Sequence, residues 1–156
     1  MMELPESFNL ALADFGATMG AELVLAGGQC NFTVDGTVEV EIDYDDSVQM
    51  AIAWAVVGIA PEDGYAADRA KALLAMNELG EANGGFSLSL DPVTRRIVAH
   101  DSRPAELFES ADRIAAWIGG LVELVKCIRA DFALRFPSPD LLPGDEEEES
   151  EDEGAV

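Results

Sequence analysis

Residues 29–57 read QCNFTVDGTVEVEIDYDDSVQMAIAWAVV, and this stretch predicts three consecutive antiparallel strands. In its first two parts apolar and polar residues alternate, as they do in strands with one buried face. The dipeptide Asp35-Gly36 between them favours a tight hairpin, because both residues tolerate a positive φ. A wider turn follows at residues 44–47. Residues 48–57 are then apolar on both faces, so we expect this third strand to lie at the centre of a sheet.

The rest of the chain supplies helices and strands that can cover this meander. Apolar residues three and four apart predict three helices: a first with its stripe over 8–19 and with Pro5 and Glu6 in its first turn, a second over 65–79, and a long third with its stripe over 107–132. Alternation predicts two more strands, at 86–90 and 96–100. We therefore expect an α+β fold in the order α-β-β-β-α-β-β-α, in which a five-stranded antiparallel twisted sheet packs with three helices.

The length and charge of the chain limit its possible domain organisation and its possible binding partners. The 156 residues suit one domain, which we place at residues 1–136. Residues 137–156 contain three prolines followed by a run of acids, so they predict a linker followed by a disordered acidic tail. The formal net charge is −22, of which residues 145–153 carry eight negative charges, so −14 remains elsewhere. Such a charge disfavours nucleic acid and anionic membranes, and it suits either a basic or apolar-plus-basic partner or a protein that the charge simply keeps soluble.

No group of residues predicts catalysis or metal binding. Cys30 and Cys127 lie far apart in the sequence, and we expect both to be buried thiols. The single histidine, His100, has no paired acid and nucleophile. The aspartates within residues 43–46 lack the glycine and glutamate of a calcium-binding loop. We therefore expect a protein that is not an enzyme and has no cofactor and no metal. Because we find neither a signal peptide nor a long apolar run, we expect it in the cytoplasm.

Short motifs occur along the chain in the order found in one protein family. They are Met19-Gly20, Phe32-Thr33-Val34-Asp35, Gly58 with Pro61-Glu62, Leu73-Leu74-Ala75-Met76-Asn77, and Gly84-Gly85 followed by Leu88, Leu90 and Asp91. Together with the order of helices and strands, they resemble the class I type III secretion chaperones of the Tir-chaperone (CesT-like) family. The resemblance covers residues 8–136, although Arg95-Arg96 replaces a glycine often found in the last turn.

The resemblance implies a homodimer that binds the N-terminal segment of a secreted effector, holds it extended and keeps it competent for export. The implied dimer contact comprises the second helix, which has a flat face of small residues, and the fourth strand. Its residues are Ala66, Ala70, Leu73, Asn77, Phe86 and Leu88. The alternative is a YbjN-like regulatory or interaction protein that has the same fold and no secretion role.

We expect the client segment at the first helix and the first strand. Residues 29–34 form a free edge in a meander, and an extended peptide can add a strand to such an edge. If the third helix covers one face of the sheet by itself, the first helix has more large apolar residues than one-sided packing needs. The predicted client-binding residues are Phe8, Leu12, Phe15, Phe32 and Val34. The alternative is that all five belong to the core.

Overall fold

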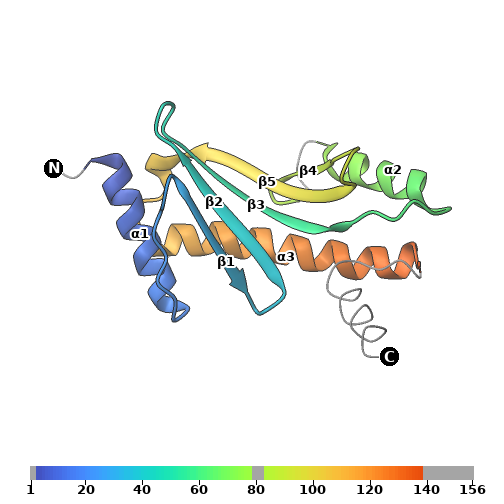
Figure 1. Cartoon of the computed structure of the whole chain (residues 1–156), viewed down its shortest axis with the longest axis horizontal. Coiled ribbons are helices and arrows are strands. Elements are labelled where there is room, and N and C mark those ends of the chain that lie inside the picture. Colours follow the sequence, from blue (N-terminus) through green and yellow to red (C-terminus); the bar gives the residue numbers. More distant parts are fainter. Residues whose placement is uncertain (1–2, 79–82, 139–156) are drawn as a thin grey trace, which may run out of the picture.

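The computed structural model describes residues 3–78 and 83–138 (Figure 1). Its elements follow in the order α1 (Leu4–Thr18), β1 (Gln29–Val34), β2 (Val38–Asp45), β3 (Met50–Ile59), α2 (Ala66–Met76), β4 (Ser87–Leu90), β5 (Arg96–Pro104), the 3₁₀ turn η2 (Ala105–Leu107) and α3 (Ala111–Arg135). The predicted α+β fold and its five-stranded antiparallel sheet are confirmed. Residues 139–156, which hold most of the predicted linker and all of the predicted acidic tail, lie outside the described residues.

The sheet has the strand order β1-β2-β3-β5-β4, and each neighbouring pair is antiparallel. β3 therefore lies at the centre, as its apolar sequence predicts, and β1 and β4 are the two edges. The first hairpin turns at Asp35 and Gly36, with φ angles of 54° and 71°, as the dipeptide predicts. β5 extends beyond the predicted residues 96–100 because it pairs with β3 as far as Pro104.

Helices α1 and α3 pack together on one face of the sheet (Figure 1). On that face β3 contributes the small side chains of Ala51, Ala53 and Ala55, all fully buried, so α3 can lie close to the strand. From α3 the core receives a stripe of large apolar residues: Ile114, Ile118, Leu121, Val125, Ile128 and Phe132. α1 adds Phe8 and Leu12, so the expectation that the third helix covers this face by itself is wrong.

Polar contacts determine where α3 begins and how it is attached to the sheet. Ser110 caps its first turn, so Leu107, the first residue of the predicted stripe, lies in the 3₁₀ turn instead and is exposed. Further along the helix, Arg129 donates hydrogen bonds to the carbonyl oxygens of Thr37, at 2.9 Å, and Val57, at 2.8 Å. The Arg129 guanidinium thus joins α3 to the β1–β2 turn and to the end of β3, where the pairing with β5 is irregular.

A buried guanidinium holds the start of α2 in place. Arg69 is only 4% exposed. It donates two hydrogen bonds to the Asp63 carboxylate, at 2.8 and 3.0 Å, and one to the carbonyl oxygen of Phe136, at 3.2 Å. The hydrogen bond from Arg69 holds the pKa of Asp63 well below its usual range. The loop before α2 is thereby connected to the C-terminal end of α3.

Candidate functional site

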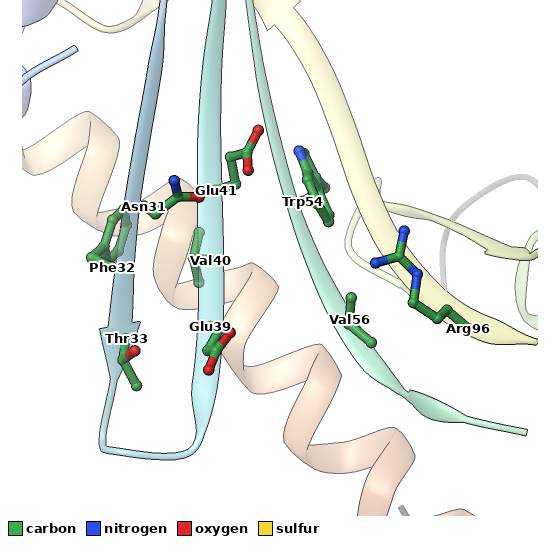
Figure 2. Close-up of a pocket in the computed structure, with 9 residues that line it drawn as sticks. All are labelled: Asn31, Phe32, Thr33, Glu39, Val40, Glu41, Trp54, Val56 and Arg96. Atoms are coloured by element: carbon green, nitrogen blue, oxygen red, sulfur yellow. The ribbon is translucent and has the colours of Figure 1, made fainter. Parts of the chain in front are cut away.

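The face of the sheet that points away from α3 carries a hollow of about 360 Å³ (Figure 2). It is lined by Asn31, Phe32 and Thr33 of β1, Glu39, Val40 and Glu41 of β2, Trp54 and Val56 of β3, and Arg96 of β5. β3 directs its larger side chains to this face, because Ile52, Trp54 and Val56 alternate with the buried alanines. These three side chains are only half-buried, and exposed apolar area of this kind is typical of an interaction surface.

Two carboxyl groups lie on this face next to Trp54. Glu41 and Asp43 are two residues apart in β2, so their side chains point the same way. A side-chain hydrogen bond with Asp43 raises the pKa of Glu41 to about 7, and burial and charge repulsion add to the shift. Glu41 is therefore partly protonated near neutral pH. The Trp54 indole N–H donates to Asp43 Oδ2 at 3.4 Å.

Two polar atoms on the same face are buried and have no hydrogen-bond partner within the part of the chain that the structure describes. They are Asp43 Oδ1, an acceptor, and Arg96 Nε, a donor. Asp43 of β2 lies opposite Ile52 of β3, and Arg96 of β5 lies opposite Ile59, so the two atoms lie on either side of β3 and towards its opposite ends. A polar group of a bound peptide can satisfy either atom.

The structure divides the five predicted client-binding residues into two groups. Phe8, Leu12 and Phe15 of α1 are buried in the core, because α1 shares the core face with α3. The expectation that these three side chains are exposed is therefore wrong. Phe32 and Val34 are half-buried at the sheet edge, where β1 pairs with β2 and, at Gln29, also forms a bridge with Ala26. A client that adds a strand at this edge can contact both of them.

The six residues predicted at a dimer contact lie on or beside α2 and β4. Three are buried and two half-buried within the chain itself: Leu73, Phe86 and Leu88, then Ala66 and Ala70. The sixth, Asn77, lies along the outer edge of β4. Its Nδ2 donates to the carbonyl oxygen of Leu88 at 2.7 Å, and its Oδ1 accepts from the N–H of Leu88 at 2.8 Å. Leu74, which lies one position beside the small-residue stripe of α2 and is not among the six, is 72% exposed.

Residues 3–78 and 83–138 contain neither a metal-binding cluster nor a membrane-spanning helix. No group of three His, Cys, Asp or Glu side chains in these ranges is placed to hold a metal ion. No helix in the same ranges combines the length and the apolar character that crossing a membrane requires. Cys30 is buried, as predicted, whereas Cys127 is exposed on α3, so the prediction for the second thiol is wrong.

The chain resembles known proteins in both sequence and fold. The sequence profile of the Tir chaperone protein (CesT) family matches residues 11–129. No curated protein sequence matches the chain. Among solved structures, a chain of the HopA1–SchA chaperone–effector complex is similar, with 22% identity, a TM-score of 0.65, and coverage of 81% of this chain and 97% of that chain. A chain of the ExsC–ExsE complex has 17% identity and a TM-score of 0.69, with coverage of 89% and 99%.

A third solved structure has the same fold. YbjN from E. coli is 14% identical, with a TM-score of 0.58 and coverage of 83% of this chain and 90% of that chain. At identities of 14–22% these likenesses show the fold alone. The family is shown by the profile match, which spans most of the described chain from α1 to α3. The chain therefore belongs to the Tir chaperone protein (CesT) family, as the order of its motifs predicts.

Proposed function

We propose that this protein is a type III secretion chaperone that binds the N-terminal segment of a secreted effector and keeps that segment competent for export. The family match over residues 11–129 carries the proposal. The fold adds support, because a chain of a solved chaperone–effector complex has it as well. The proposed activity is binding rather than catalysis.

The client segment binds in extended form along β1. An edge strand offers unpaired backbone N–H and C=O groups, and a peptide that adds to it gains main-chain hydrogen bonds. The half-buried Phe32 and Val34 then contact alternate client side chains on one face. Trp54 and Val56 can contact a continuation of the client on the other face. The net charge of −22 favours client segments that carry Lys or Arg.

The protein acts as a homodimer through the outer face of α2. Ala66, Ala70 and Leu74 are four residues apart and so lie along one side of the helix. The two small residues permit close approach, and the exposed Leu74 supplies apolar area. Light scattering should give twice the chain mass of 16.6 kDa, and Leu74→Asp should shift the mass towards the monomer. A monomer mass for the unmodified protein at micromolar concentration would contradict this proposal.

The alternative is a YbjN-like regulatory or interaction protein without a secretion role. YbjN has the same fold, at a TM-score of 0.58. The two functions differ in their partner, so co-expression with N-terminal segments of effectors encoded in the same genome separates them. Under the proposal at least one such segment co-purifies with the protein. If none does, the chaperone function is rejected and the alternative is favoured.

The proposed site is tested by replacing one residue of the β1 edge. Phe32→Ser should lower the affinity for the co-purifying segment at least tenfold, about 1.4 kcal/mol, while the protein still unfolds cooperatively. Val93→Ser is the control, because Val93 is 86% exposed in the turn between β4 and β5. It should change neither affinity nor stability. If the unmodified protein, Phe32→Ser and Val93→Ser bind the segment with equal affinity, the client does not bind at the β1 edge.

A further inference from the structure

A second hollow lies between the end of α1, the β1–β2 hairpin and α3. Its volume is about 250 Å³, and its walls are mainly apolar, formed by Phe15, Met19, Val34, Ile118, Gly119 and Val122. We call it the α1–α3 pocket. Val34, the last residue of β1, belongs to its wall, so the pocket opens beside the strand on which the client segment is proposed to lie.

Gly119 and Gly120 are adjacent in α3, but the space beside their Cα atoms differs. Glycine in a helix interior is less stable than alanine, so each position calls for a reason. A Cβ on Gly120 would lie 3.3 Å from a ring carbon of Phe86, so Gly120 allows the segment before β4 to pack closely on α3. A Cβ on Gly119 would meet no atom within 4 Å. Packing within the described chain thus explains Gly120 and leaves Gly119 unexplained.

The charged side chains around the pocket indicate what kind of occupant fits it. Asp35 and Lys126 line it and form an ion pair with each other, so their charges are matched. Glu123 also lines the pocket, and it makes no ion pair with any residue that the structure describes. An apolar cavity next to an unpaired carboxylate is complementary to an apolar side chain that has a cationic residue close to it.

We propose that the α1–α3 pocket receives one large aliphatic side chain of the client segment, and that Gly119 sets the size of the side chain it accepts. A Lys or Arg of the client near this side chain pairs with Glu123. The inference rests on the proposed chaperone function, and it adds the chemical class of the client residue that is recognised. Gly119 is then a specificity-determining residue, because any side chain at this position would project into the space that the client fills.

The adjacent glycines provide a matched experiment with two readouts, thermal unfolding and affinity for the effector segment that co-purifies with the unmodified protein. Gly119→Ala should melt at the same or a higher temperature, yet bind the segment more weakly. Gly119→Leu, which fills the pocket, should weaken binding at least tenfold. Gly120→Ala should show the opposite pattern, a lower melting temperature from the contact with Phe86 and an unchanged affinity of the folded protein.

A second arm identifies the client residue. Each aliphatic residue of the segment is replaced by alanine in turn. One replacement should weaken binding to the unmodified protein but have little further effect on binding to Gly119→Leu, because the two changes remove the same contact. Glu123→Gln should weaken binding by a smaller factor that disappears at high salt.

Each other outcome overturns the inference in a recognisable way. Full affinity in Gly119→Leu shows that the client does not enter the pocket, while the proposed function stands. A changed oligomeric mass in Gly119→Leu, with client affinity intact, assigns the pocket to a contact between two copies of the chain. No binding of any effector segment by the unmodified protein rejects the proposed function, and this inference with it.

Discussion

The two edges of the sheet are built from similar alternating strands, yet they present different chemistry. At the β4 edge, the Asn77 amide bonds both the N–H and the carbonyl oxygen of Leu88, so a side chain occupies the place of a neighbouring strand. At the other edge, β1 pairs with β2 and bridges Ala26 at Gln29 alone, and its apolar residues Phe32 and Val34 are half-buried. One amide thus occupies both backbone groups of Leu88 at the β4 edge, whereas residues 30–34 of the β1 edge are suited to strand addition.

The helices near the two edges, α2 beside β4 and α1 beside β1, also differ in the contacts that attach them to the rest of the fold. The α2 end is joined through hydrogen bonds of Arg69 to Asp63 and to the Phe136 carbonyl. The α1 end is joined by aromatic packing, with the Phe8 ring 5.5 Å from that of Tyr44. Hydrogen bonds fix an orientation, whereas apolar packing contributes most of the burial energy. Substitutions at each end should therefore have effects of different size and kind.

The largest effect is expected at the apolar end. Phe8 is fully buried, so Phe8→Ala should lower the free energy of unfolding by about 3–5 kcal/mol, measured by denaturant titration. Leu10→Ala is the control on the same helix, because Leu10 is 51% exposed, and it should change stability by less than about 0.5 kcal/mol. Similar losses in both variants would show that α1 is not anchored through Phe8.

A smaller effect is expected at the polar edge. Asn77→Ala leaves the N–H and carbonyl of Leu88 without their partner and should cost about 1–3 kcal/mol. Asn77→Asp keeps the acceptor for the Leu88 N–H but loses the donor to its carbonyl, so its stability should be intermediate. Amide hydrogen exchange at Leu88 is the direct measurement. Unchanged protection in Asn77→Ala would show that this edge is closed by something other than the amide.

The smallest effect depends on pH and concerns the open face beside the β1 edge. Glu41 has an ordinary pKa of 4.5 and a pKa of about 7 in the folded chain. The folded protein therefore binds more protons than the unfolded chain between these values, and this group makes stability fall as pH rises from 4.5 to 7. Glu41→Gln should remove that slope, so the variant should gain stability relative to the unmodified protein as pH rises. Parallel pH profiles of melting temperature would refute the assignment.

Much of the fold could be predicted because its signals are local. Asp35-Gly36 specifies a hairpin because both residues tolerate a positive φ. The apolar run that includes Trp54 indicates a central strand by its own composition, without reference to other segments. Helix and strand order follow from periodicities within each segment. The five-stranded sheet could be predicted from these local patterns and from the short connections between the strands.

The candidate site was harder to predict because it depends on contacts between distant segments. An amphipathic pattern shows that Phe8 and Phe15 face something apolar, but it does not show whether that is the core or a client. The bond from Asn77 to Leu88 and the hydrogen bond from Arg69 to Phe136 depend on chain placement that periodicity does not encode. The open space at Gly119 is likewise visible only when α1, the hairpin and α3 are assembled.

The hydrogen bonds of Arg129 have a consequence for how the protein is made. This residue joins α3 to Thr37, which lies 92 positions earlier in the chain, and α3 supplies a large part of the core. Contacts this far apart in sequence form slowly, and during synthesis the sheet emerges before the helix that buries it. Limited proteolysis of chains stalled before and after α3 should show protection only in the longer one. A protein proposed to shield the unfolded segments of others thus itself passes through a stage at which its own apolar sheet is uncovered.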